Sequence, residues 1–83
     1  MKGKMTSKEL LETILKAFVN HPEEIKVNRK VDEMGVLYEV EAHPSDRGLI
    51  IGKKGRMVLA LKQILRSVGF KTRERISIRV KQE

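Results

Sequence analysis

Apolar residues recur every three or four positions over residues 10–19, which is the spacing of one face of an α-helix. Thr6 and Glu9 precede this stretch at the spacing of a capping box, a pattern that marks a helix N-terminus. Pro22 cannot continue a helix, so we expect the segment 20–22 to end it. The predicted apolar face consists of Leu10, Leu11, Ile14, Leu15, Phe18 and Val19.

Three later segments alternate apolar and polar residues, which is the pattern of half-buried β-strands. The first covers residues 25–32 and the second covers residues 36–42, with a turn at 33–35, so the two are predicted to pair as a hairpin. Arg29 interrupts the apolar side of the first strand, which is formed by Ile25, Val27 and Val31. A third strand is predicted near the C-terminus from Ile76, Ile78 and Val80.

Two helices are predicted on either side of a glycine-containing turn. Ser45 or Asp46 can cap a short helix that runs to about residue 51, and a longer helix follows over residues 56–68. Gly69 is placed to terminate the longer helix. Its predicted buried face consists of Met57, Ala60, Leu61, Ile64, Leu65 and Val68.

The order helix, strand, strand, helix, helix, strand predicts an α+β two-layer sandwich in which the helices cover one face of a three-stranded sheet. The 83 residues suffice for a single small domain over 1–83, in which we expect residues 1–5 to be a flexible N-terminal tail. The uncovered face of the sheet is polar enough to stay solvated. Its polar residues are Lys26, Lys30, Glu39, Glu41, Arg79 and Lys81.

The composition narrows the classes of protein that the chain can belong to. It contains no cysteine, so neither a disulfide framework nor a thiolate metal site is available. No stretch approaches the roughly 18 apolar residues of a membrane-spanning helix, and no signal-peptide pattern follows the basic start. We therefore expect a cytoplasmic protein.

Positive charge is concentrated in one half of the chain. The formal net charge is +7. Residues 1–44 carry seven Lys and Arg against eight Asp and Glu, a net charge of −1, whereas residues 45–83 carry eleven against three, a net charge of +8. A one-sided basic surface is the electrostatic footprint of a polyanionic partner, and the alternative is a basic domain that is merely soluble.

The turn between the two helices, Gly52-Lys53-Lys54-Gly55, lies inside the basic half. It lacks the spacing and the Ser or Thr of a nucleotide-binding P-loop, and the dinucleotide-binding glycine pattern is also absent. Glycines permit a tight reversal of the chain, and the start of the second helix attracts anions. Lys53, Lys54 and Arg56 can therefore meet a sugar–phosphate backbone, or they are incidental charges on a connector.

No other residues form a convincing chemical site. His21 and His43 each precede a proline and have no third ligand residue beside them, so we interpret them as residues that end a helix and a strand. Glu39 and Glu41 lie on one strand face and are expected to be solvated. No arrangement of Ser, His and Asp suggests nucleophilic catalysis. We expect a protein that is not an enzyme and that uses no cofactor and no metal.

The stretch Ile50-Ile51-Gly52-Lys53-Lys54-Gly55-Arg56 resembles the core motif of KH domains, whose G-x-x-G loop holds nucleic acid. A helix and a hairpin precede the motif and one strand follows it, which resembles the type II order and implies a mixed sheet with a parallel last strand. Residues 20–24 and 43–48 narrow the resemblance to small stand-alone bacterial KH proteins of the KhpA type. These are cytoplasmic RNA-binding proteins that self-associate and pair with a larger RNA-binding protein, KhpB (Jag).

The resemblance implies that single-stranded RNA or single-stranded DNA lies in a groove between the loop helices and a strand. Gly52, Lys53, Lys54, Gly55 and Arg56 would hold the phosphates, and the strand edge near residues 40–42 would offer backbone hydrogen bonds. Stacking would be scarce because Tyr38 and Phe18 are expected in the core. The floor and rim are expected to comprise Ile50, Ile51, Met57, Arg47 and Arg73, although Ile51 and Met57 are equally suited to the core.

Leu59 falls at a helix position that is often polar in proteins of this kind, so it either packs at the rim or belongs to a self-association surface. The resemblance therefore leaves two functions open. The first is non-catalytic RNA binding, in RNA- or ribosome-related regulation, together with a second RNA-binding protein. The second is a KH-fold dimerisation or protein-interaction module with weak or no nucleic-acid binding of its own.

Overall fold

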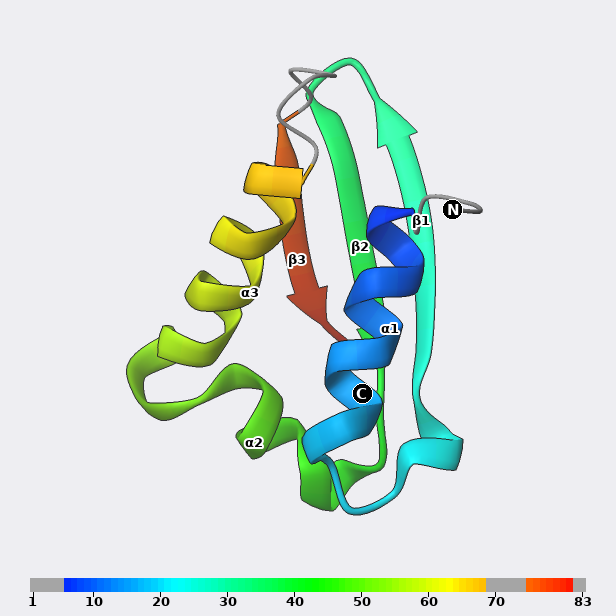
Figure 1. Cartoon of the computed structure of the whole chain (residues 1–83), viewed down its shortest axis with the longest axis vertical. Helices are drawn as coiled ribbons and strands as arrows, with labels where there is room; N and C mark the ends of the chain where they lie inside the picture. Colours follow the sequence, from blue (N-terminus) through cyan, green and yellow to red (C-terminus); the bar gives the residue numbers. More distant parts are fainter. Residues whose placement is uncertain (1–5, 69–74, 82–83) are drawn as a thin grey trace, which may run out of the picture.

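A computed structural model describes residues 6–68 and 75–81 of the chain, and it has the predicted order of elements (Figure 1). The expected tail at residues 1–5, the expected helix end at Gly69 and Arg73 lie outside the described residues. The helices are α1 (Ser7–Phe18), α2 (Arg47–Ile51) and α3 (Arg56–Val68), and the strands are β1 (Lys26–Asp32), β2 (Gly35–Glu41) and β3 (Ile76–Val80). Short 3₁₀ turns form η1 (Pro22–Glu24), η2 (Pro44–Asp46) and η3 (Lys53–Gly55).

Helix α1 begins at the capping box that the sequence predicts. The backbone N–H of Glu9 donates to the Thr6 hydroxyl at 3.1 Å, and the Thr6 N–H donates to the Glu9 carboxylate at 3.0 Å. Two N–H groups that the helix itself cannot satisfy thus find acceptors. Leu11 and Leu15, one helical turn apart, are completely buried, so the predicted apolar stripe anchors α1 to the sheet.

The sheet has the strand order β1-β2-β3, with β2 in the centre. Strands β1 and β2 form the predicted antiparallel hairpin, while β2 and β3 run parallel, as expected. At the hairpin turn, Gly35 has a φ of +129°, and an added Cβ there would collide with the backbone carbonyl of Arg75. The same carbonyl accepts a hydrogen bond from the Val36 N–H at 2.7 Å, so Gly35 lets β3 approach the start of β2.

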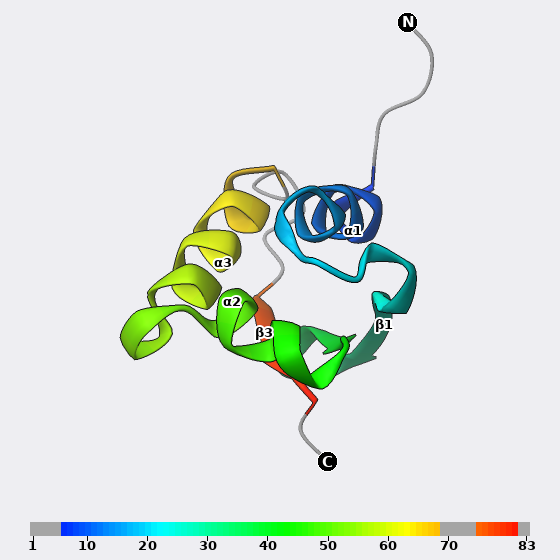
Figure 2. The same ribbon diagram turned by 90° about the horizontal axis from the view of Figure 1, so that it is seen from below.

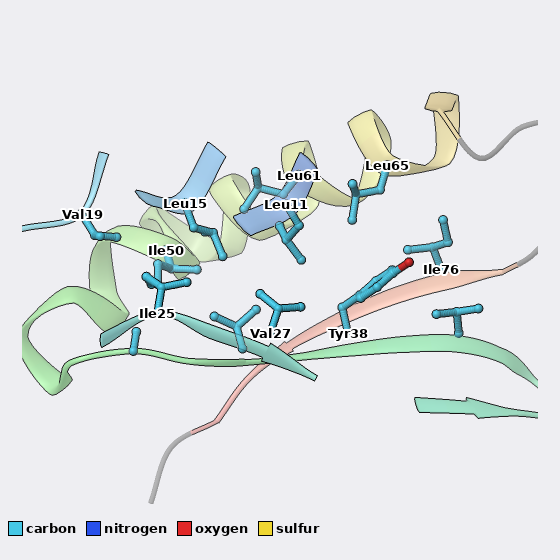
Figure 3. Close-up of a cluster of buried hydrophobic side chains, with 13 residues drawn as sticks. Leu11, Leu15, Val19, Ile25, Val27, Tyr38, Ile50, Leu61, Leu65 and Ile76 are labelled. Carbon is cyan, nitrogen blue, oxygen red and sulfur yellow. The ribbon is translucent and has the colours of Figure 1, made fainter. Parts of the chain in front are cut away.

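The helices pack on one face of the sheet and enclose a single apolar core (Figure 2). Side chains of α1, α2 and α3 point toward those of the strands in this layer (Figure 3). Tyr38 is buried in the core and Phe18 packs against it, as predicted. The buried core residues are Leu11, Leu15, Val19, Ile25, Val27, Val36, Tyr38, Val40, Ala42, Ile50, Leu61, Leu65 and Ile76.

Polar side chains pair with one another on the other face of the sheet. The Lys30 ammonium lies 3.1 Å from the Glu39 carboxylate. Glu41 accepts a hydrogen bond from the Asn28 side chain at 3.1 Å and lies 3.9 Å from the Lys81 ammonium. Each glutamate is thus close to a lysine, Lys30 on β1 for Glu39 and Lys81 directly after β3 for Glu41.

Two apolar predictions are wrong in detail. Val31 is 60% exposed, because the hairpin turn extends beyond the end of α1 (Figure 1). On α3, Leu61 and Leu65 are buried as expected, but Met57 and Ile64 are 36% and 43% exposed and Ala60 is exposed too. Helix α3 contacts β3, α2 and α1, and its apolar stripe is wider than the surface that these neighbours cover. Among the described residues, no helix is long and apolar enough to cross a membrane.

Candidate nucleic-acid interface

The segment between α2 and α3 has a backbone shape that depends on its glycines. Gly52 and Gly55 have φ angles of +79° and +75°, and Lys54 between them has a φ of +56°. The Gly52 N–H donates to the Gly48 carbonyl at 2.8 Å, and the Gly55 N–H donates to the Gly52 carbonyl at 3.1 Å. Three of four consecutive residues are thus in the left-handed region, which favours glycine.

The two glycines differ in their surroundings. A Cβ on Gly52 would lie 2.5 Å from the Cβ of Met57 and 2.6 Å from its backbone nitrogen. A Cβ on Gly55 would meet no atom within 4 Å. Gly52 therefore allows α3 to start close against the loop, whereas the surface at Gly55 is open for a ligand to approach the backbone.

The positive charges around the loop are accessible. Lys53, Lys54 and Arg56 are exposed, and the sequence from residue 47 to residue 66 contains six Lys and Arg and no Asp or Glu. The first N–H groups of a helix lack intrahelical acceptors and carry partial positive charge. The start of α3 therefore adds to the attraction that these side chains exert on an anion.

Ile50 and Ile51, neighbours in the predicted floor, have different environments. Ile50 is completely buried in the core (Figure 3), so the expectation that it contacts a base is wrong. Consecutive residues of an α-helix point about 100° apart, so the sheet covers Ile50 and leaves Ile51 at the margin. Ile51 is half-buried and Met57 is accessible, so these two residues remain available to a ligand.

The strand edge expected near residues 40–42 is not free. Strand β2 lies in the centre of the sheet, and Val40 pairs with Val27 on one side and Val80 on the other. The Val40 carbonyl also accepts a hydrogen bond from the Lys81 N–H at 2.8 Å. Among the described residues, the strand beside α2 and α3 with an unpaired edge is β3, because its parallel pairing to β2 places it at the border of the sheet.

Arg47 is the expected rim residue that the structure describes. It is half-buried and lines a cavity of about 160 Å³ at the end of the sheet. The cavity is also lined by Glu24, Glu41, Ala42 and Lys81. Arg47 thus lies at the start of α2, on the side where β2 and β3 end, and it is separated from the loop by the length of that helix.

Sequence reasoning did not assign a role to three further residues near the loop. Gly48 is exposed, and an added Cβ there would meet no atom within 4 Å. Leu49 is 44% exposed on the same short helix, and Val58 is half-buried on α3. Of the three, only Gly48 carries a signal in the sequence. A glycine inside a helix costs about 1 kcal/mol relative to alanine, so its presence there indicates a role other than helix stability.

Asp46 occupies the N-cap position of α2, as one of the two alternatives predicted, but its side chain makes no capping hydrogen bond there. It is completely buried, and its carboxylate accepts hydrogen bonds from the segment that follows α1. Burial raises the pKa of Asp46, but hydrogen bonds from the backbone N–H groups of His21 and Asn20 and from the His21 ring outweigh it, so the pKa lies below its ordinary value. His43, not Ser45, caps η2.

The two histidines, interpreted separately as chain-end residues, stack on each other. Their ring centroids lie 3.9 Å apart with an angle of 12° between the planes. In the described part of the chain, no group of three His, Asp or Glu side chains could hold a metal ion. Nothing in the local sequence indicates this contact, because the two residues are brought together by the fold.

The mixed three-stranded sheet, the helices on one face and the Gly-Lys-Lys-Gly loop between two of them define a KH domain. The family model for the KhpA/KhpB KH domain matches residues 8–80. The chain therefore belongs to the KhpA/KhpB family of KH-domain proteins.

Similar proteins span nearly the same length. An RNA-binding protein KhpA from Thermotoga maritima is 41% identical over 73 residues, which cover 88% of this chain and 96% of that protein. An RNA-binding protein KhpA from Clostridium acetobutylicum is 33% identical over 73 residues, which cover 88% of this chain and 97% of that protein. The similarity thus extends over almost all of the domain, including the loop.

Proposed function

We propose that this protein binds single-stranded RNA without catalysing a reaction, and that the Gly52–Gly55 loop holds the sugar–phosphate backbone. The observation that carries the proposal is the pair of exposed lysines on a left-handed turn, inside a stretch without acidic residues. Relatives named RNA-binding protein KhpA support it. Single-stranded DNA offers the same backbone charge, so binding assays should include both.

In the proposed complex, each part of the surface contacts a different part of the nucleic acid. Lys53, Lys54 and Arg56 attract phosphates, and the open surface at Gly55 admits the sugar–phosphate chain close to the protein backbone. Bases then lie over Ile51 and Met57, toward the unpaired edge of β3. Arg47 extends the positive rim at the other end of α2, and Arg73 is proposed for the rim from the family resemblance alone.

The apolar floor contains no aromatic side chain among the described residues, because Tyr38 is buried and Phe18 packs against the core. Base stacking on aromatic rings contributes about 1–3 kcal/mol per base where it occurs. Its absence leaves phosphate contacts as the main source of affinity, so we infer modest sequence preference and steep salt dependence.

A charge-reversal experiment tests the proposal. We expect the variant Lys53→Asp/Lys54→Asp to keep its circular dichroism spectrum and to lose most of its affinity for a fluorescent single-stranded RNA in an anisotropy titration. The matched control, Lys8→Asp/Lys16→Asp on α1, changes the net charge by the same amount far from the loop. Equal affinity of the two variants would contradict the proposal, since only the net charge of the protein, and not the position of the lysines on the loop, would then matter for binding.

We propose that the protein acts in the cytoplasm, in RNA- or ribosome-related regulation, with a second RNA-binding protein of the KhpB kind. The family model, which covers the KH domains of both KhpA and KhpB, supports this pairing. A self-associated form would place two loops on one RNA and raise the overall affinity without new contacts. Copurification with a KhpB-like protein, before and after nuclease treatment, tests the pairing. Loss of the partner after nuclease treatment would mean that RNA tethers the two proteins, whereas retention would mean that they contact each other directly.

A second candidate function is a protein-interaction module with little RNA binding of its own. It is favoured by Leu59, which is 50% exposed on α3. The charge-reversal experiment distinguishes the two candidates, because self-association through α3 does not depend on Lys53 and Lys54.

A further inference from the structure

Asp46 is the one charged side chain among the described residues that is completely buried. It ends η2 and directly precedes α2. Its carboxylate accepts hydrogen bonds from the backbone N–H groups of Asn20 at 3.2 Å and His21 at 2.8 Å, and lies 3.1 Å from Nδ1 of the His21 ring. The carboxylate therefore ties the segment after α1 to the start of α2, across 25 residues of sequence.

The two histidines complete this connection. The backbone N–H of Ser45 donates to Nδ1 of His43 at 3.1 Å, and the His43 ring stacks on the His21 ring. Because a backbone N–H can only donate, Nδ1 of His43 is an acceptor, whereas Nδ1 of His21 carries the proton that faces the carboxylate. We call Asp46, His21 and His43 the latch. Figure 2 looks onto this end of the molecule, where the chain leaves α1 and where α2 begins.

The latch holds the start of α2. This helix has only five residues, which is too short to keep a fixed orientation by itself. Ile50 lies four residues after Asp46 and is completely buried in the core. Of the three residues between them, Arg47 is half-buried, whereas Gly48 and Leu49 are exposed. Helix α2 is thus attached at its start by hydrogen bonds and at its end by apolar packing.

Hydrogen bonds and apolar packing constrain the helix differently. Ile50 packs by shape alone, and apolar contacts have no directional preference. The carboxylate of Asp46 has three donors at defined positions, so it sets the direction in which the chain enters α2. The loop begins six residues later at Gly52, so a rotation at the start of α2 moves both lysines.

We propose that Asp46 is a positioning residue for nucleic-acid binding, which acts by orienting α2 and the Gly52–Gly55 loop through the latch. The proposal rests on the proposed RNA-binding function. Asp46 itself does not touch the RNA, because its side chain has no exposed surface. Its removal takes away the hydrogen bonds at the start of α2, which is then held by Ile50 and by packing against α3 and β3, and the lysines sample orientations that do not fit the phosphates.

The first test compares Asp46→Ala with Val36→Ala, a core variant at the opposite end of β2 from the latch. Binding to a fluorescent oligouridine is measured at a temperature where circular dichroism shows both variants to be folded. We expect Asp46→Ala to weaken binding roughly tenfold, by analogy with the residues that orient metal ligands, whose loss costs about 10–100-fold, and Val36→Ala to bind like the wild type. Asn in place of Asp46 keeps one acceptor oxygen, so Asp46→Asn should restore part of the affinity.

The second test is independent of RNA. Hydrogen–deuterium exchange of the free protein should be faster over residues 47–56 in Asp46→Ala than in the wild type, with little change over residues 10–15 of α1. Wild-type affinity in folded Asp46→Ala, or an equal loss in Val36→Ala, would overturn the proposal. If the wild type binds no RNA, the proposed function fails. Unchanged exchange over residues 47–56 in Asp46→Ala would reject the latch as a positioning device.

Discussion

The Cα of Gly52 faces the first turn of α3 so closely that an added Cβ would lie 2.5 Å from the Cβ of Met57. Real Cβ atoms do not approach each other at this distance, so a side chain at Gly52 must displace either the loop or the helix. Gly52 also has a φ of +79°, which a residue with a side chain adopts only at a cost. This single contact connects the shape of the loop to the start of α3.

We therefore expect Gly52→Ala to destabilise the protein by about 1–3 kcal/mol through its backbone conformation, and by a further amount through the collision with Met57. Gly55→Ala, whose Cβ meets no atom within 4 Å, should carry the backbone cost alone. Thermal denaturation followed by circular dichroism measures both. Equal melting temperatures for the two variants would show that Met57 yields freely to the new methyl group.

Gly48→Ala should separate stability from binding. Gly48 lies inside α2, where alanine is favoured over glycine by about 1 kcal/mol, and its Cβ would meet open space. We expect the melting temperature to rise by a few degrees while RNA affinity falls, because the added methyl group obstructs nucleic acid that approaches the exposed Gly48 backbone. A variant that is more stable and binds equally well would exclude that approach.

Acid should destabilise the fold through two carboxylates. The hydrogen bond from Lys30 holds the pKa of Glu39 below its ordinary value of 4.5. The pKa of Asp46 lies below 3.8, because hydrogen bonds from His21 and Asn20 outweigh the effect of burial. A carboxyl with a lowered folded pKa contributes stability that is present above its unfolded value and is lost as the pH falls through the folded value.

Denaturant titrations between pH 6 and pH 2 measure this effect. We expect the wild type to lose stability below about pH 4, and Glu39→Gln and Asp46→Asn to be less stable at pH 6 but less sensitive to acid. The partly exposed pair of Glu39 and Lys30 should contribute the smaller share, since solvent screens such pairs. If both variants lost stability in acid as the wild type does, the loss would have to come from the protonation of other groups.

Self-association through α3 should depend on Leu59. We expect the apparent molar mass from light scattering to rise with concentration in the wild type and to stay monomeric in Leu59→Glu, because a charge on that exposed position opposes contact between two apolar faces. Gln63→Glu, on the same helix, controls for added negative charge. A wild type that stays monomeric at high concentration would contradict the prediction.

RNA affinity should fall steeply with salt and less steeply once the loop lysines are removed. For single strands, the logarithm of the affinity changes with the logarithm of the salt concentration with a slope of about −0.7 per phosphate neutralised. Lys53→Ala/Lys54→Ala should therefore reduce the magnitude of the slope by about 1.4. An unchanged slope would mean that neither lysine neutralises a phosphate.

The order of elements, the capping box and the parallel last strand could be predicted because each follows from a pattern within a few residues or from the family resemblance. The Gly-Lys-Lys-Gly loop was recognisable for the same reason. Local periodicity also placed Leu11, Leu15, Leu61 and Leu65 in the core, since these residues repeat at the helical period and lie at the centre of an apolar stripe.

The positions that the sequence could not assign are those at the margins of such stripes and those that depend on distant partners. Ile50 and Ile51 are chemically identical, and only the packing of α2 against the sheet buries one and leaves the other accessible. Asp46 and His21 meet because η2 and the end of α1 adjoin in the folded chain. The sequence by itself thus determined which elements form, because their signals are local, whereas the extent of each covered face, the free edge of β3 and the latch were decided by where neighbouring elements begin and end.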